Sequence, residues 1–341
     1  MDDAGHVEAE TAAVRPADEM DWERLATFLR GCLDLPAGPL EARQFTAGRA
    51  NLTYLVDIAG VRVVVRRPPH GTLPPGAHDM AREAKVLTGL ADVYPRAPKL
   101  LAFSDDVSII GAPFLVTEYR SGTAIRDRVP VSMEHHPEVA RRVDLALVDA
   151  VADLHAVDVD AAGLTDLGRP DGFADRQVSG WADRWRRAAP DDSLPVMDEV
   201  GEILAASVPT PAKVAIVHND LKLDNCQFDA DDPDHVTAVF DWDMATLGDP
   251  LFDLGLVITS MSSFPVWEIS ADEAGARYAE RSGIGVDRLD WYLAFASWRT
   301  AVVLQQLYNR HVSGDSADQR LASLGAHIPG AAQRARSLLD Q

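Results

Sequence analysis

The sequence predicts an α+β fold with two lobes, a small strand-rich N-terminal lobe followed by a larger and mainly helical one. Three observations lead to this expectation. β-branched residues concentrate between residues 45 and 66, apolar residues recur at helical spacing from Val143 onward, and two short apolar strands interrupt the helical part near residues 214–240. The length of 341 residues suits about two folding units of ordinary size.

The expected boundaries follow from changes in composition along the chain. Residues 1–20 are acidic, rich in Ala and without periodicity, so we expect a flexible N-terminus. A helix predicted at residues 21–33 opens an N-terminal lobe that spans residues 21–119. The C-terminal lobe then takes up residues 120–341.

The N-terminal lobe is predicted to contain a hairpin, a helix and a linking strand. The hairpin runs from Phe45 to Arg66 and turns at Gly60, and a loop rich in Pro and Gly follows it. Met80, Ala84 and Leu87 mark one face of a helix that also carries Glu83. The apolar run at residues 113–119 predicts the linking strand.

The C-terminal lobe is predicted to be helical around one β insert. Apolar residues at helical spacing predict a helix that ends near His155, and the aromatic residues at 165–211 indicate a helical insertion with Trp181 and Trp185 in the core. Residues 214–217 and 236–240 are predicted strands joined through an acidic turn. A later stripe predicts a buried helix face: Trp291, Phe295, Trp298 and Val302.

Charge and composition exclude several classes of function. Lys and Arg total 32 and Asp and Glu total 53, so the formal net charge is −21. Such a chain repels polyanions, and we expect neither a nucleic-acid partner nor an anionic membrane partner. Its two cysteines, Cys32 and Cys226, lie outside any metal-binding spacing. The acidic N-terminus does not resemble a signal peptide, so we expect a cytoplasmic protein; nothing indicates an oligomeric state.

One pair of segments carries a chemical signature. His218-Asn219-Asp220-Leu221-Lys222-Leu223-Asp224-Asn225 is followed, sixteen residues later, by Asp241-Trp242-Asp243 at the end of an apolar strand. Phosphoryl transfer needs a carboxylate that orients the attacking hydroxyl and oxygen ligands for Mg²⁺ on the nucleotide phosphates. Asp220, Asn225 and Asp241 form such a set. A lone His-x-Asp would also fit a capped turn, but the full spacing is specific.

With these motifs the chain resembles the aminoglycoside phosphotransferase and choline kinase superfamily, distant relatives of protein kinases. The resemblance covers most of residues 42–311. Three segments are similar to the subset related to phosphotransferase domains fused to acyl-CoA dehydrogenases: Asp241-Trp-Asp-Met-Ala-Thr-Leu-Gly-Asp-Pro-Leu-Phe-Asp-Leu, Arg66-Arg67-Pro68-Pro69 and Leu73-Pro-Pro-Gly-Ala-His78. The resemblance implies a bilobal, protein-kinase-like fold that uses ATP or GTP with Mg²⁺.

The resemblance assigns roles in the C-terminal lobe. It makes Asp220 the catalytic carboxylate, Asn225 and Asp241 the Mg²⁺ ligands and His218 a support of the catalytic loop. Asp253, twelve residues after Asp241, would be structural. We expect Asp243 either to join the metal ligands or to cap the following turn.

The N-terminal lobe departs from the kinase pattern at one position. The pattern Val-x-x-Lys falls on Val63-Val64-Val65-Arg66, and Glu83 follows seventeen residues later as the expected partner of the cation. Arg keeps the charge and binds phosphate through a longer, forked group. Arg67 is the alternative, because a register error of one residue would exchange the two. Two surface arginines without a nucleotide role are the less favoured alternative.

The resemblance places further nucleotide contacts on main-chain segments. The loop Ala47-Gly48-Arg49-Ala50-Asn51-Leu52-Thr53 occupies the phosphate-covering position, where amides near Gly48 and the side chain of Asn51 or Thr53 would contact phosphate. A plain hairpin turn is the other interpretation. Glu118 and Tyr119 would place their main chain against the adenine.

The predicted function is transfer of the γ-phosphoryl group of ATP or GTP to the hydroxyl of a small molecule, either aminoglycoside-like or hydroxyacyl-CoA-like. By analogy, residues 181–187 and a helix with Tyr292, Arg299 and Tyr308 would line the acceptor side.

The missing lysine motivates an alternative function, a non-catalytic kinase-fold module that binds nucleotide or metabolite. Asp241-Trp242-Asp243 is also typical of haloacid-dehalogenase-type phosphatases, but no lysine follows residue 222. A protein kinase is disfavoured, because Asp-Phe-Gly and Ala-Pro-Glu segments are absent.

Overall fold

The computed structural model describes residues 10–46, 51–71, 78–126, 128–189, 194–262, 267–316 and 318–340. The chain divides into two compact units, and each contains segments that are distant in sequence. The first unit comprises Met1–Val139, Asp160–Leu164 and Leu223–Ala245, and the second comprises Ala140–Val159, Thr165–Lys222 and Thr246–Gln341. The lobe boundaries predicted at residues 20 and 119 are not the boundaries of these two units. They stay predictions.

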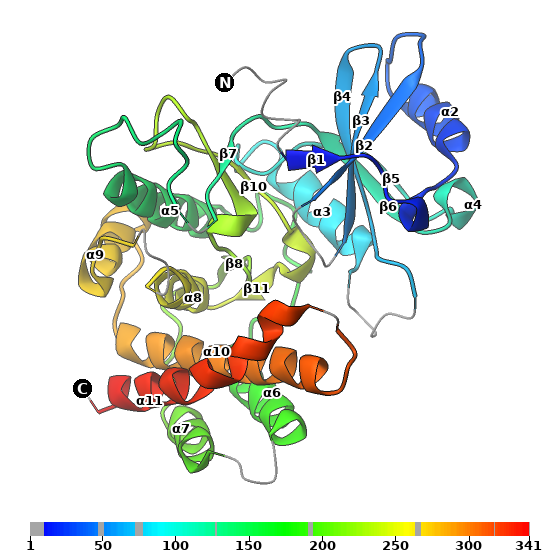
Figure 1. The fold of residues 1–341 in the computed structure, drawn as a ribbon. Coiled ribbons are helices and arrows are strands. Elements are labelled where there is room, and N and C mark those ends of the chain that lie inside the picture. The colour runs from blue at the N-terminus through cyan, green and yellow to red at the C-terminus, as the bar shows by residue number, and fades with distance from the viewer. Residues whose placement is uncertain are drawn as a thin grey trace. The chain divides into compact units, whose positions relative to one another are not determined.

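A six-stranded antiparallel sheet forms the centre of the first unit (Figure 1). Its spatial order is β1 (Thr11–Ala12), β2 (Leu40–Phe45), β3 (Leu52–Ile58), β4 (Val61–Arg67), β6 (Phe114–Glu118) and β5 (Leu100–Ser104). β3 and β4 pair from Leu52–Arg67 to Ile58–Val61, which confirms the predicted hairpin and its turn at Gly60. Its first arm begins at Leu52 and not at Phe45, which ends β2. Leu25 and Leu29 of α2 (Trp22–Cys32) are buried with Tyr54, Val56 and Phe114 on one face of the sheet.

The first unit also holds the helix that carries Glu83 and a small second sheet. The helix is α3 (Met80–Leu90), and its Met80, Ala84 and Leu87 are buried as predicted. The second sheet has the order β10 (Val236–Val239), β9 (Cys226–Phe228) and β7 (Thr123–Ala124). Short helices complete the unit: η1 (Pro16–Asp18), α4 (Val107–Ile110), η2 (Leu223–Asn225) and η3 (Trp242–Met244).

The expectation of a flexible terminus at residues 1–20 does not hold for residues 11–18. Thr11 and Ala12 pair with Phe45 and Gln44 as an edge strand. Asp18 is buried and accepts a hydrogen bond from Gln44 Nε2 at 2.9 Å. An acidic, non-periodic segment is thus held in place as an edge strand paired with β2 and by one buried carboxylate, which periodicity does not reveal.

The second unit is mainly helical. Its elements are α5 (Val139–Ala156), α6 (Phe173–Ala188), α7 (Pro195–Ala206), β8 (Ala215–Val217), β11 (Thr246–Gly248), α8 (Leu251–Met261), α9 (Ala271–Ser282), α10 (Leu289–Val312), η4 (Gln319–His327) and α11 (Ile328–Leu338). α10 is the long central helix, against which α6, α8 and α11 pack (Figure 1). The predicted stripe of Trp291, Phe295, Trp298 and Val302 is buried, and so are Trp181 and Trp185. None of the helices in the described ranges is both long and apolar enough to span a bilayer.

Candidate active site

Arg66 is the centre of a polar cluster in the first unit. Along β4, Val63, Val65 and Arg67 are buried, whereas Arg66 alternates to the other face of the strand. There Arg66 Nη1 donates to Glu83 Oε1 at 2.8 Å, and Arg66 Nη2 donates to the carboxylate of Asp241. The predicted pair of Arg66 and Glu83 is therefore present, and Asp241 joins it.

The side chain of Arg67, the alternative cation, lies in a different environment from that of Arg66. Its side chain lies on the core face of the sheet, and Arg67 Nη1 donates to the carbonyl oxygen of Ile110 at 2.9 Å. A buried guanidinium bonded to main-chain carbonyls anchors the strand to α4. The strand alternation therefore leaves Arg66 as the arginine that faces the predicted metal ligands.

Asn51 and His78 complete the surroundings of Arg66. With its amide oxygen turned toward Arg66, Asn51 accepts a bond from Arg66 Nε at 3.1 Å and donates to His78 Nδ1 at 2.9 Å. His78 Nδ1 lies 3.8 Å from Asp243 Oδ2. Burial and the charge of Arg66 lower the pKa of His78, so the imidazole is neutral and its Nδ1 accepts the bond from Asn51. Sequence reasoning identified Asn51 as a site residue, whereas His78 entered only as the last residue of the segment Leu73–His78 and was given no role.

The charges of the cluster depend on each other. Burial raises the pKa of Glu83 to about 7, assisted by the nearby Asp241 and Asp243 and opposed by Arg66. Burial would lower the pKa of Arg66, but Glu83 and Asp241 outweigh it and leave the pKa raised. The cluster therefore keeps Arg66 charged and places more acidic groups around it than one cation neutralises.

The hairpin of β9 and β10 brings the predicted metal ligands to one end of the small sheet. Cys226 pairs with Val239, Asn225 precedes β9, and Asp241 follows shortly after β10. The chain turns at Asp241, whose φ of +70° lies in the left-handed region. Arg82 of α3 fixes the end of this loop, because its Nε and Nη2 donate to the carbonyl oxygen of Ala245 at 2.9 and 2.7 Å. Sequence reasoning did not identify Arg82.

The other predicted nucleotide contacts are less closely grouped. Glu118 ends β6, where its main-chain N–H donates to the carbonyl of Lys99 at 3.0 Å and its Oε1 accepts from Lys99 N at 2.9 Å. The ring of Tyr119 lies 5.8 Å from the guanidinium of Arg62. Gly48 lies outside the described residues. The structure thus brings together Arg66, Glu83, Asn51, Asp241 and Asp243, while Glu118 and Tyr119 remain predictions.

The predicted catalytic loop lies in the second unit and is held by Asp253. Asp253 Oδ2 accepts from the main-chain N–H of His218 at 2.6 Å, and Oδ1 accepts from that of Asn219 at 2.8 Å. His155 Nε2 lies 3.3 Å from Asp253 Oδ2, and its Nδ1 lies 2.8 Å from the hydroxyl of Tyr278. Asp253 is therefore a buried support of the loop, as the resemblance implied.

The electrostatics of this support are consistent with an ionised carboxylate. Burial alone would raise the pKa of Asp253, but the hydrogen bond and the charge of His155, together with His218, outweigh it and leave the pKa lowered. Asn219 adopts a φ of +65°, a left-handed turn that Asn tolerates well. The buried His218 accepts a bond from the N–H of Asp220 through Nδ1 at 3.3 Å. These contacts fix the main chain from His218 to the N–H of Asp220.

Cations surround the side chain of Asp220. Lys222 Nζ lies 2.9 Å from Asp220 Oδ2, and both side chains are about one-third exposed. Arg299 of α10 interacts electrostatically with Asp220 and donates to the carbonyl oxygen of Asn219 at 3.0 Å. Asp220 is therefore an accessible carboxylate on a rigid loop, which suits a group that orients a hydroxyl.

The oxygen ligands that the first unit offers fit a Mg²⁺ ion that is also bound by the phosphates of a nucleotide. In the described residues, no group of three or more His, Cys, Asp or Glu side chains is arranged to hold a metal ion by itself. Asp241, Asp243 and Asn225 offer hard oxygen ligands, and Mg²⁺ is commonly held by one or two carboxylates together with substrate phosphates and water. The residues thus fit a metal ion that arrives with a nucleotide.

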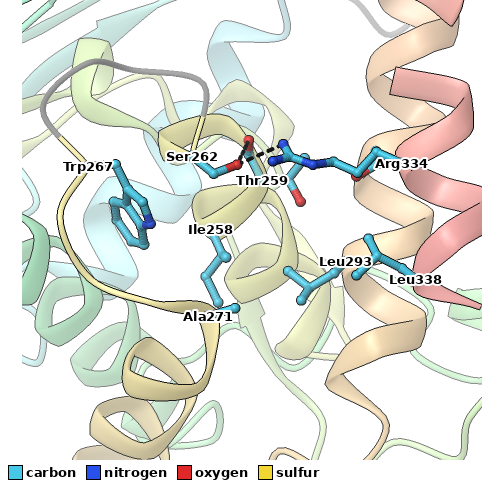
Figure 2. A pocket seen from close by; sticks show the side chains of 9 residues that line it. Ile258, Thr259, Ser262, Trp267, Ala271, Leu293, Arg334 and Leu338 are labelled. Atoms are coloured by element: carbon cyan, nitrogen blue, oxygen red, sulfur yellow. Dashed lines mark hydrogen bonds between the residues drawn. The ribbon is translucent and has the colours of Figure 1, made fainter. Parts of the chain in front are cut away.

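A separate pocket of about 150 Å³ lies in the second unit between α8, α10 and α11 (Figure 2). Arg334 Nη1 donates to the hydroxyl of Ser262 at its rim at 3.0 Å, and Ile258, Leu293 and Leu338 provide apolar walls. None of the predicted site residues lines it.

Comparison with known proteins defines the family. The model of the phosphotransferase enzyme family matches residues 41–292, and the chain belongs to this family. A crystal structure of a candidate aminoglycoside phosphotransferase from Ralstonia eutropha has a TM-score of 0.82 and 28% identity over 94% of this chain and 99% of that chain. The aminoglycoside phosphotransferase APH(4)-Ia, crystallised with ADP and hygromycin B, has a TM-score of 0.59 and 15% identity over 92% of this chain and 97% of that chain.

Among curated proteins, the chain is similar to acyl-CoA dehydrogenase family member 10 of Mus musculus, with 32% identity over 90% of the chain. The match covers only 30% of that longer protein. The predicted fold is confirmed by these comparisons: an N-terminal antiparallel sheet followed by a mainly helical region, as in the kinase-like fold of aminoglycoside phosphotransferases.

Proposed function

We propose that the protein transfers the γ-phosphoryl group of ATP or GTP to the hydroxyl of a small molecule and requires Mg²⁺. The observation that carries this proposal is the cluster in which Arg66 bonds both Glu83 and Asp241, residues 17 and 175 positions away in sequence. Phosphoryl transfer needs a cation on a strand, a carboxylate on a helix that holds this cation, and an acidic metal ligand after a later hairpin. Arg66, Glu83 and Asp241 have these positions. Their presence in a member of a phosphotransferase family supports the same use.

Each residue has a proposed task in nucleotide binding. Arg66 contacts the phosphates, Glu83 orients Arg66, and Asn51 keeps Arg66 Nε in place. Asp241 and Asn225, with Asp243 as a further candidate, would hold Mg²⁺, which when bound neutralises the charge that develops on the transferred phosphoryl group. The binding of ADP by the structurally similar APH(4)-Ia supports a nucleotide site in this fold.

Asp220 is proposed to orient the acceptor hydroxyl and to accept its proton late in the transfer. Its loop is rigid because Asp253 binds the two amides that precede Asp220. Most of the acceleration would come from positioning and from charge neutralisation, because the transition state of phosphoryl transfer is loose. The relatives' names mention acyl-CoA and an aminoglycoside, and two acceptor classes are proposed accordingly: hydroxyacyl-CoA-like molecules and aminoglycosides.

Calorimetric titration with ATP and with GTP, each with Mg²⁺ and with EDTA, tests the nucleotide site. All three nitrogens of the Arg66 guanidinium are already bonded, to Glu83, Asp241 and Asn51. Phosphate must therefore replace some of these bonds, and an ion that takes Asp241 would free Arg66. We expect binding with Mg²⁺ that weakens about tenfold or more in EDTA and in Arg66→Ala. Incubation with candidate acceptors followed by mass spectrometry then tests transfer, and absence of nucleotide binding contradicts the proposal.

A second candidate function is a non-catalytic module that binds nucleotide or metabolite. It is favoured by the same cluster, because the cation is arginine and its donors are engaged by protein acceptors. Nucleotide binding without any transfer product over a broad panel of hydroxyl acceptors would support this function. Detection of a phosphorylated acceptor would exclude it.

A further inference from the structure

The indole ring of Trp181 in α6 carries two arginine side chains. The Cζ atom of Arg184 lies 4.3 Å from the ring centroid, and that of Arg299 in α10 lies 4.9 Å from it. Trp181 is buried, Arg299 is half-buried and Arg184 is exposed. α6 and α10 pack against each other in the second unit (Figure 1). The two guanidinium groups therefore share one apolar platform.

Neither guanidinium forms a salt bridge with a carboxylate of the described residues, although Arg299 interacts electrostatically with Asp220 and Asp253. Arg299 Nη2 donates to the carbonyl oxygen of Asn219 at 3.0 Å, and the contact of Arg184 is the indole ring. The carboxylate of Asp183, the neighbouring acid on α6, bonds Arg186 instead. No ion pair joins Arg184 or Arg299 to any residue that the structure describes.

Several positively charged side chains lie close together around Trp181. Burial and the charge of Arg187 lower the pKa of Arg184. Burial lowers the pKa of Arg299 as well, and Arg184 lowers it further, while Asp220 and Asp253 offset part of the effect. The guanidinium groups of Arg187 and Arg299 thus each repel that of Arg184, in a chain whose net charge is −21. An oxyanion that bonded them would relieve this repulsion, and arginine is the side chain best suited to bind phosphate or carboxylate through paired donors.

The position of the two arginines connects them with the predicted catalytic loop. Arg299 bonds Asn219, the residue before Asp220, and Lys222 contacts Asp220 itself at 2.9 Å. A molecule whose hydroxyl reaches Asp220 would therefore meet a positive surface on α6 and α10. An aminoglycoside, which carries several ammonium groups, would be repelled by the same surface.

We propose that Arg184 and Arg299, stacked on Trp181, bind a negatively charged oxygen group of the phosphoryl acceptor, a phosphate or a carboxylate. The inference rests on the proposed function, which gives Asp220 its role. Of the two acceptor classes proposed there, it selects the hydroxyacyl-CoA-like molecules over the aminoglycosides. The acceptor is an oxyanion that also bears a hydroxyl. Arg184 and Arg299 are then determinants of specificity.

Calorimetric titration of the full chain with four small molecules tests this. sn-Glycerol 3-phosphate and 3-hydroxybutyrate combine a hydroxyl with a phosphate and a carboxylate, respectively, and thus separate the two sources of the anion. Glycerol lacks the charge, and hygromycin B has the opposite one. We expect at least one of the two oxyanions to bind at millimolar concentration, with an affinity that falls as salt is added, while glycerol and hygromycin B do not bind.

Variants locate the binding. Arg184→Ala should weaken binding of the oxyanion about tenfold, since one charge-assisted contact is lost. Arg186→Ala is the matched control, because it removes the same charge from an exposed position of the same helix; its affinity should equal that of the unaltered chain. Arg66→Ala should also leave the affinity unchanged, whereas an anion bound at the nucleotide cluster would be lost in Arg66→Ala and kept in Arg184→Ala.

Three outcomes would overturn the inference: no binding of either oxyanion, equal affinity in Arg184→Ala, or tighter binding of hygromycin B. Arg184 is exposed and its replacement should not impair folding, which near-ultraviolet circular dichroism checks. Arg299→Lys, which keeps the charge but not the fork, should weaken binding less than Arg299→Gln. Because the titration needs no turnover, a failure of phosphoryl transfer and a failure of anion binding are separate results.

Discussion

Asp220 is a partly exposed carboxylate on a loop whose main chain is fixed by Asp253. Asp220→Asn keeps the size of the side chain but cannot accept a proton. We expect the rate of transfer to fall at least about 100-fold, while nucleotide affinity changes less than about twofold, because no nucleotide contact is assigned to Asp220. Product formation by mass spectrometry and nucleotide titration measure the two effects.

The control for this variant is Asp224→Asn, an exposed carboxylate on the same segment without an assigned role. Its rate should match that of the unaltered chain. An equal loss of rate and nucleotide affinity in Asp220→Asn would show that Asp220 supports the nucleotide site and not the transfer step.

The buried carboxyl group of Asp144 in α5 should make the free energy of unfolding depend on pH. Its side chain is fully buried, and Oδ2 accepts from the N–H of Glu268 at 2.6 Å. Burial raises the pKa of Asp144 to about 7 from 3.8. Because the folded state holds the proton more tightly than the unfolded state, Asp144 should lower the free energy of unfolding as pH rises from about 4 to about 7.

Asp144→Asn should remove this part of the pH dependence and raise the stability at pH 8 relative to the unaltered chain. Asn keeps an oxygen that can accept from Glu268 N and carries no charge. Urea unfolding at pH 5.5 and pH 8 measures the difference. Asp153→Asn, at a partly exposed site of the same helix where Asp153 pairs with Arg281, should show little change between the two pH values. A stability of Asp144→Asn that falls at pH 8 would contradict the assignment.

The residues of the site differ in how far the sequence could reveal them. The spacing of Arg66 and Glu83, and that of Asp220, Asn225 and Asp241, follow from motifs within short segments. The bonds of Arg66 to Asp241 and of Asn51 to His78 join segments that no local pattern connects. No role was predicted for His78, although it ends a segment that carries the resemblance, and no motif includes Arg82, because single polar residues acquire their role only through the neighbours that the fold supplies.

Among the elements, α8 shows how closely backbones approach in the second unit. A Cβ atom added at Gly255 would lie 2.8 Å from the carbonyl oxygen of Tyr292 in α10. Gly255→Ala should therefore destabilise the protein by ~1–3 kcal/mol despite the better helix propensity of Ala. Urea unfolding monitored by circular dichroism provides the measurement.

Gly180→Ala in α6 is the matched control for the close approach. Apart from its chain neighbours and the backbone of its own helix, no atom of the described residues lies within 4 Å of the position of its added Cβ. Helix propensity then acts alone and should stabilise the protein by ~0.5–1 kcal/mol. If both variants shifted stability in the same direction, the contact between α8 and α10 would not determine the effect.

The elements that the sequence predicted best are those with a strong period. The hairpin of β3 and β4, and the helices α3, α5 and α10, follow from alternation or helical spacing of apolar residues. β2 was not predicted. Its residues are mostly half-exposed and include Glu41, Arg43 and Gln44, so their strand conformation depends on pairing with β3.

The chain as a whole passes repeatedly between its two units. The first unit includes Leu223–Ala245, which contributes β9, β10 and the buried Trp242. The ring of Trp242 packs edge-to-face on Tyr94 at 5.8 Å, and Asp241 bonds Arg66. A fragment of residues 10–139 lacks these groups, and we expect it to have little near-ultraviolet circular dichroism and a tendency to aggregate.

A second fragment tests whether the missing segment is the reason. In it, residues 223–245 follow residue 139 through a Gly/Ser linker. This fragment should be more resistant to proteolysis and show a stronger aromatic circular dichroism signal than residues 10–139 alone. If residues 10–139 gave a cooperative unfolding transition by themselves, the first unit would not depend on the later segment.

The same connectivity has a consequence for biosynthesis. A ribosome delivers residues from the N-terminus onward, so the six-stranded sheet emerges long before β9, β10 and Asp241. Until residue 245 has left the exit tunnel, Arg66 lacks one of its carboxylate partners, Tyr94 lacks the ring that covers it and Arg82 lacks its carbonyl acceptor. Most of the first unit is therefore synthesised before the second, yet it cannot reach its final packing until residues 223–245 have also been translated.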